Sequence, residues 1–158
     1  MGGIFMFKFP TQDGVHYITQ RQIPVAGTRV IMTYLIKGSA PVFAPVSGDP
    51  PACIHLYFQR QGDDMMAKKG TTEFYRWWSN PIAANLALGE ITLIAPIKPD
   101  QWSSVLGKTG DKAPESFWDA WRNIQNIGMT FGAVNQFGHG VMLTSGSAKF
   151  ILKKFQIL

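Results

Sequence analysis

Alternation of apolar and more polar side chains along Cys53 to Gln61 constrains the fold more than any other feature of the sequence. Two sets of residues alternate there: Ile54, Leu56 and Phe58 on one parity, and His55, Tyr57 and Gln59 on the other. Successive side chains of a β-strand point to opposite faces, so this segment is expected to be a strand with one face in a core.

Similar short segments recur along the chain and are separated by turn-forming residues, as in sandwiches and barrels. The expected strands are residues 15–19, 28–37, 53–61, 72–79, 90–97, 127–131, 140–144 and 148–158. The stretch 38–51 is rich in Pro, Gly and Ser, which predicts a long loop, and residues 62–70 predict a second, polar loop.

One helix is expected near residues 116–125. Ser116 can cap it, and Asp119 stands three residues later, a variant of the capping box. Phe117, Trp121 and Ile124 then share one face of the helix. Gly128 limits its extension.

The element pattern lacks repeated strand–helix–strand units, which argues against a doubly wound parallel sheet. With 46% hydrophobic residues the chain can fill a core, and 158 residues suit one domain. We therefore expect an all-β protein, a single jelly-roll β-sandwich of two antiparallel sheets with one short helix near 116–125, in which residues 1–158 form one domain.

Residue types that carry catalysis are sparse. The only histidines are His16, His55 and His139, and none has a partner at metal-binding spacing. A nucleophile elbow, a P-loop and a dinucleotide-binding glycine turn are all missing from the sequence. We expect neither enzymatic activity nor a metal site. The single cysteine, Cys53, excludes an internal disulfide and is expected to be a buried apolar residue.

Two further features offer weaker hypotheses about ligands. Asp63 and Asp64 beside Gly62 could supply oxygen ligands to a structural calcium, but a solvated turn is the preferred interpretation, so no cofactor is expected. His139 lies in a glycine-flanked loop and could reach a ligand, although a turn histidine without a role is again the preferred interpretation.

The charge pattern restricts the classes of partner. The net charge is +5, but lysines and arginines are scattered, which argues against nucleic acid as a partner. No stretch approaches the roughly 20 apolar residues that span a bilayer, so membrane insertion is not expected. A signal peptide is not seen in the sequence, which predicts synthesis in the cytoplasm. A role in a virion or outside the cell stays open.

Aromatic residues on the expected strands are the best candidates for ligand contact. Tyr57, Tyr75 and Trp77 lie on the parity opposite the apolar residues of their strands. Flat rings among hydrogen-bonding groups match the C–H faces and hydroxyl edges of sugars. The competing interpretation is that these rings are buried in the core. The candidate ligand-binding residues are Tyr57, Gln59, Tyr75 and Trp77, with His55 and Arg60 in support.

Several segments together resemble galactose-binding-like β-jelly rolls, the superfamily of many carbohydrate-binding modules. They are residues 54–60, 75–78, 90–93, 117–124, 127–132 and 147–158. The resemblance implies a non-catalytic module that recognises glycans on the concave face of a sheet. Lys149 and Lys153 stand where many members place an acidic residue near a structural calcium, so the resemblance does not carry the calcium.

A second function fits the same fold. Jelly rolls also build virions, and virion subunits need no export signal. The alternative is therefore a phage virion structural protein, such as a head-decoration, fibre or tail component. Its partners would be other subunits of an assembly, including copies of itself, and exposed aromatics such as Trp77 or Trp102 would be contact surfaces.

Overall fold

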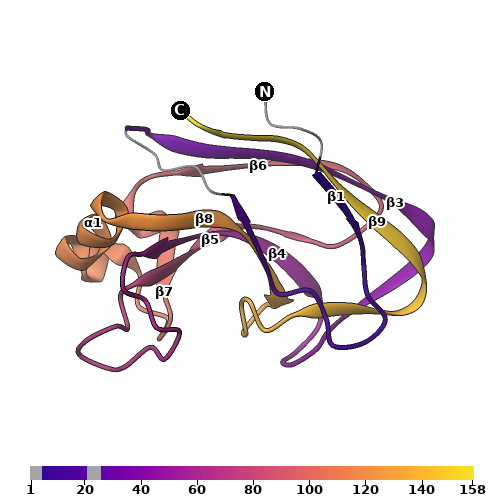
Figure 1. Ribbon diagram of the computed structural model, residues 1–158, viewed down its shortest axis with the longest axis horizontal. Helices are drawn as coiled ribbons and strands as arrows, with labels where there is room; N and C mark the ends of the chain where they lie inside the picture. Colours follow the sequence, from indigo (N-terminus) through magenta and orange to yellow (C-terminus); the bar gives the residue numbers. More distant parts are fainter. Residues whose placement is uncertain (1–4, 21–25) are drawn as a thin grey trace.

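Two antiparallel β-sheets lie face to face in the computed structural model, which describes residues 5–20 and 26–158 (Figure 1). The four-stranded sheet has the order β1-β9-β3-β6, and the five-stranded sheet has the order β2-β8-β4-β5-β7. The strands are β1 (Phe5–Lys8), β2 (Tyr17–Gln20), β3 (Arg29–Pro45), β4 (Ala52–Arg60), β5 (Arg76–Asn85), β6 (Gly89–Pro96), β7 (Trp102–Ser104), β8 (Ile124–Ala133) and β9 (Val141–Ile157).

The chain passes repeatedly from one sheet to the other. Strands β1, β3, β6 and β9 form one sheet, while β2, β4, β5 and β8 form the other, with β7 added at its edge. Many hydrogen-bonded neighbours, such as β1 with β9 and β3 with β9, are therefore distant in sequence, whereas β4 and β5 are consecutive. The expected all-β sandwich of two antiparallel sheets is confirmed.

The core lies between the sheets and follows the period-two pattern. Alternate residues of β3 and β4 point inward and are fully buried: Val30, Met32, Tyr34 and Ile36 from β3, and Ile54, Leu56 and Phe58 from β4. Phe150 of β9 stacks on Tyr34 with ring centroids 5.1 Å apart. Each such side chain contributes about 1.5–3 kcal/mol on burial, so this layer holds the sheets together.

Two strands are longer than the sequence predicts. Residues 38–45 continue β3, and β9 is one strand over Val141–Ile157, so the expected loop at 38–51 and the break at 145–147 are wrong at these positions. The register between β3 and β9 shifts between Ser39 and Val42. Ala40 and Gly146 there have positive φ angles of 42° and 74°. Gly146 thus lies at a β-bulge inside a continuous pair of strands.

Strand β5 begins four residues later than expected. Tyr75 N–H donates to the Thr72 carbonyl at 3.1 Å, so residues 72–75 form a turn. Phe74 precedes the strand and stacks on Trp77 at 6.0 Å. Because Phe74 lies outside β5, its apolar side chain does not indicate which face of that strand is buried. Trp77 points into the core, and the parity expected for this strand is wrong.

The helix α1 spans Pro114–Arg122 and lies at the end of the sandwich near β7 and β8 (Figure 1). Its N-cap is Ala113, without a side-chain hydrogen bond, so the expected cap at Ser116 is wrong. Pro114 takes the first position, where its missing N–H costs nothing. Phe117 is fully buried and fastens α1 to the core. No helix in residues 5–20 and 26–158 is long and apolar enough to cross a bilayer.

Candidate ligand-binding site

The outer face of the five-stranded sheet carries most of the aromatic and polar side chains that the sequence singled out. Tyr57 of β4 lies directly opposite Trp78 of β5, and Gln59 lies opposite Arg76. Tyr17 of β2 meets Tyr57 edge to face at 5.1 Å. Although this face points away from the core, much of it is buried, because the segment joining β4 to β5 folds back over it.

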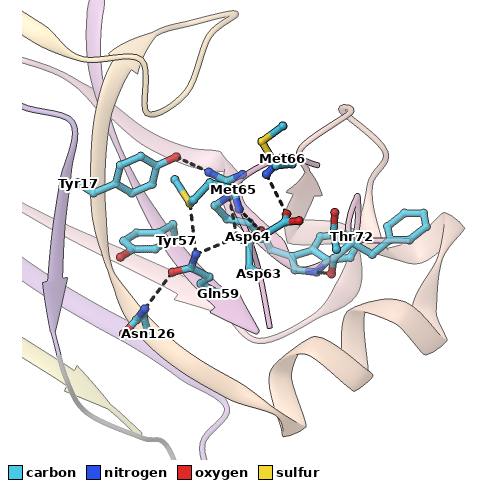
Figure 2. Close-up of polar contacts among 12 residues, drawn as sticks. Tyr17, Tyr57, Gln59, Asp63, Asp64, Met65, Met66, Thr72 and Asn126 are labelled. Carbon is cyan, nitrogen blue, oxygen red and sulfur yellow. Dashed lines mark hydrogen bonds and ion pairs between the residues drawn. The ribbon is translucent and has the colours of Figure 1, made fainter. Parts of the chain in front are cut away.

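A buried ion pair fastens that segment to the sheet (Figure 2). Arg76 Nε lies 3.2 Å from Asp63 Oδ2, and the two side chains are only 6% and 1% exposed. Gln59 Nε2 donates to Asp63 Oδ2 at 2.8 Å, and Met65 N–H donates to Asp63 Oδ1 at 3.0 Å. Arg76 Nη1 donates to the Tyr17 hydroxyl at 3.1 Å. These bonds offset the cost of removing both charges from water.

The polar network continues across the sheet into β8 and β2. Asn126 Nδ2 donates to Gln59 Oε1 at 2.9 Å, as Figure 2 shows, and the Tyr57 and Thr19 hydroxyls share a hydrogen bond. Burial raises the pKa values of Tyr57 and Tyr17 above 10, so both phenols stay protonated at neutral pH. The middle of this face is thus covered, although His55 Nδ1, Thr130 Oγ1 and Arg76 Nε are buried there without a hydrogen-bond partner among the described residues. It does not present an open platform.

The six predicted ligand-binding residues separate into three places. Trp77 is 0% exposed in the core, so the face predicted for it is wrong. Tyr57 and His55 lie on the predicted face with Gln59, but they are only 2% and 4% exposed. The remaining two residues form a separate group at the edge near α1. Contact of these two residues, Tyr75 and Arg60, with a ligand stays a prediction.

That separate group consists of Tyr75 and Arg60 beside the helix. The Arg60 guanidinium lies over the Tyr75 ring, 4.5 Å from its centroid, and Arg60 Nε is 2.7 Å from Asp119 Oδ2. The hydrogen bond that Arg60 donates to Asp119 raises the pKa of Arg60. Both partners of the ion pair are partly exposed, so it contributes little to stability.

An open hollow remains at the end of the same sheet, where β5, β7 and the segment 134–140 meet. Its volume is about 250 Å³. The lining residues are Trp78, Asn80, Ser103, Ser104, Val105, Gly107, Asn135, Gln136, Phe137 and His139. Trp78 and Phe137 meet edge to face at 6.1 Å. We call this space the Trp78 hollow.

The chemistry of the Trp78 hollow is neutral. None of the described residues that line it is Asp, Glu, Lys or Arg. Asn80 Nδ2 donates to the Ser103 hydroxyl at 3.0 Å. Among the described residues, Trp78 Nε1 and Ser104 Oγ find no hydrogen-bond partner although both are buried. Buried donors without a partner carry a desolvation cost.

His55 supports the hollow from beneath. Its ring centroid lies 4.0 Å from that of Phe137, which lines the hollow. Burial lowers the pKa of His55 to about 4, so the imidazole is neutral at physiological pH. A neutral ring packs against Phe137 without bringing charge to the site.

None of the six candidate ligand-binding residues lines the hollow, and sequence reasoning missed its central ring. His139 lines the hollow, although the preferred interpretation of its glycine-flanked loop gave it no role. Trp78 lies on the parity opposite Trp77, so the prediction that Trp77 faces outward left Trp78 out of the candidate site. The approach of segment 134–140 to β7 is a long-range contact with no local sequence signal.

The described residues contain no group of three or more His, Cys, Asp or Glu side chains placed to hold a metal ion. Comparison of the chain with protein-family models, with curated proteins and with solved structures finds no match.

Proposed function

We propose that this protein is a non-catalytic binding module that takes a neutral carbohydrate unit into the Trp78 hollow. The observation that carries the proposal is the composition of the lining: two aromatic rings beside amide and hydroxyl groups, without a charged side chain. The proposal keeps the glycan class that the sequence resemblance implies and moves the site from Trp77 to Trp78.

A sugar ring complements such a lining on both of its surfaces. The C–H face of the sugar packs on the ring of Trp78 or Phe137. Its hydroxyls form hydrogen bonds with Asn80, Gln136 and Ser103. A charged ligand would lose water here without meeting a counter-charge, which is costly. The neutral lining therefore favours a neutral sugar over a uronic acid or a sulfated unit.

The surroundings of the hollow favour binding without reorganisation. The Asp63–Arg76 ion pair fixes the neighbouring part of the sheet face, and His55 holds Phe137 from below. Ser47 Oγ donates to Gln136 Oε1, which anchors segment 134–140. A preformed site gives up less conformational entropy on binding.

Titration of the isolated protein with neutral monosaccharides and oligosaccharides, followed by backbone amide NMR shifts, tests the proposal. Trp78→Ala removes the larger of the two aromatic rings that line the hollow, and Asn80→Ala removes an exposed amide. Each should weaken binding of a sugar by about tenfold or more, because a stacking surface or a hydrogen bond is worth about 1 kcal/mol or more. Gln125→Ala, which removes an exposed amide outside the hollow, is the matched control.

Two results would count against the proposal. Sugar hits whose shifts map away from residues 78–80 and 135–139 would place the site elsewhere. A symmetric oligomer by light scattering, together with no sugar affinity on a broad glycan array, would favour the alternative of a virion structural subunit.

A further inference from the structure

Three lysines stand in one row across the outer face of the four-stranded sheet. Lys149 of β9 lies directly opposite Lys8 of β1 on one side and Lys37 of β3 on the other. The residues next to them in sequence, Phe150 and Ile36, point into the core, so the lysines point outward. Directly opposite residues have Cβ atoms about 4.5–5.5 Å apart, which brings three ammonium groups within reach of one ligand.

The positive charge of the protein is concentrated on this sheet. Its four strands carry six cationic residues, namely Lys8, Arg29, Lys37, Lys149, Lys153 and Lys154, and one acidic residue, Glu90. That excess equals the net charge of +5 of the whole chain. Glu90 is already engaged, because Lys153 Nζ lies 2.6 Å from its Oε1. Among residues 5–20 and 26–158, no ion pair involves a lysine of the row.

The row borders a hollow of about 340 Å³ on the sheet surface. Its lining is Lys8, Lys37, Gly38, Ser147, Ala148 and Lys149. Ser147 and Ser39 form the next paired row on one side. They offer hydroxyl donors beside the ammonium groups.

Lysines placed directly opposite one another repel, and no protein group in the row relieves that repulsion. An anion with two negative charges would turn the repulsion into attraction and would receive charge-assisted hydrogen bonds from several donors. We propose that the Lys8–Lys149–Lys37 row binds a phosphate or sulfate group. The site lies on the opposite sheet from the Trp78 hollow, so the proposal does not rest on the proposed sugar site.

Binding of inorganic phosphate and of sulfate, measured in separate arms by amide NMR shifts at constant ionic strength, tests this proposal. Both arms use sodium chloride to hold the ionic strength, so that general screening is equal. Lys149→Gln should weaken anion binding by about tenfold, and Lys37→Gln should weaken it similarly, because each removes one charge-assisted hydrogen bond. Lys69→Gln removes the same charge from an exposed loop and should leave the affinity unchanged.

Thermal unfolding gives a second readout that does not depend on NMR. The anion should raise the Tm of the wild-type protein and of Lys69→Gln, but not that of Lys149→Gln. In chloride alone, Lys149→Gln should melt no lower than the wild type, since the substitution removes repulsion. A response to phosphate alone identifies a phosphoryl ligand, whereas a response to both anions includes sulfate esters. Equal binding by Lys149→Gln and wild type, or no response to either anion, would overturn the proposal.

Discussion

Acidification should destabilise this protein through one histidine. His55 is buried on β4, and its Nδ1 finds no hydrogen-bond partner among the described residues. Burial lowers its pKa from 6.5 to about 4 in the folded state. The unfolded chain therefore binds the proton first as the pH falls. The stability that neutral His55 provides is complete above about pH 6.5 and is lost progressively toward pH 4.

The size of the loss follows from that pKa difference. One pKa unit corresponds to about 1.4 kcal/mol, so a fall from 6.5 to about 4 corresponds to about 3 kcal/mol of unfolding free energy. This is a large share of the 5–15 kcal/mol typical of a domain. Replacing His55 by Gln removes the titrating group and should flatten the pH dependence by that amount.

Urea unfolding at pH 7.0, 5.5 and 4.5 measures the effect. Carboxylates also titrate in this range, so the difference between wild type and His55→Gln isolates the histidine. His139→Gln, which removes an exposed histidine, should retain the full pH dependence. The reasoning fails if His55→Gln and wild type lose stability in parallel, or if NMR places the pKa of His55 near 6.5 in the folded protein.

Two further substitutions test the packing described above. Asp63→Leu leaves Arg76 buried without its counter-charge and should lower the unfolding free energy, measured in urea, by about 3–5 kcal/mol. Asp63→Leu combined with Arg76→Met should recover much of that loss. Equal losses in the single and the double variant would mean that the charges are not desolvated. Trp77→Ala should cost about 3–5 kcal/mol, because the ring is fully buried, and Trp118→Ala should cost clearly less on the half-buried side of α1. A small effect of Trp77→Ala in calorimetry would contradict the core position.

The fold class was predictable because period-two alternation is a local property. Ile54, Leu56 and Phe58 all point into the core, as their spacing indicates. The ends of the strands were harder to predict where glycines and prolines lie inside strands. Gly38 lies within β3, and a Cβ there would fall 1.9 Å from the Ser147 carbonyl oxygen of β9. Its presence reflects a close approach between strands, which a single sequence cannot distinguish from a turn.

The candidate site was less predictable, since it depends on contacts distant in sequence. Residues 72–75 form a turn, so the alternation predicted for residues 72–79 exchanged the two faces of β5 and placed Trp77 outside. The closure of the outer face by Asp63 had no signal either, because an acidic pair beside a glycine reads as a solvated turn. Only the pairing with Arg76, thirteen positions later, takes this carboxylate out of water.

The long pairing of β3 with β9 also has a consequence for folding speed. It joins Val30 to Ile157 and Pro45 to Val141, positions roughly a hundred residues apart along the chain. Closing so large a loop must precede any gain from the central hydrogen bonds of the sheet. We expect slow folding, on the millisecond-to-second scale of high contact order, and early intermediates in which β4 and β5 have paired while β3 still lacks its neighbour.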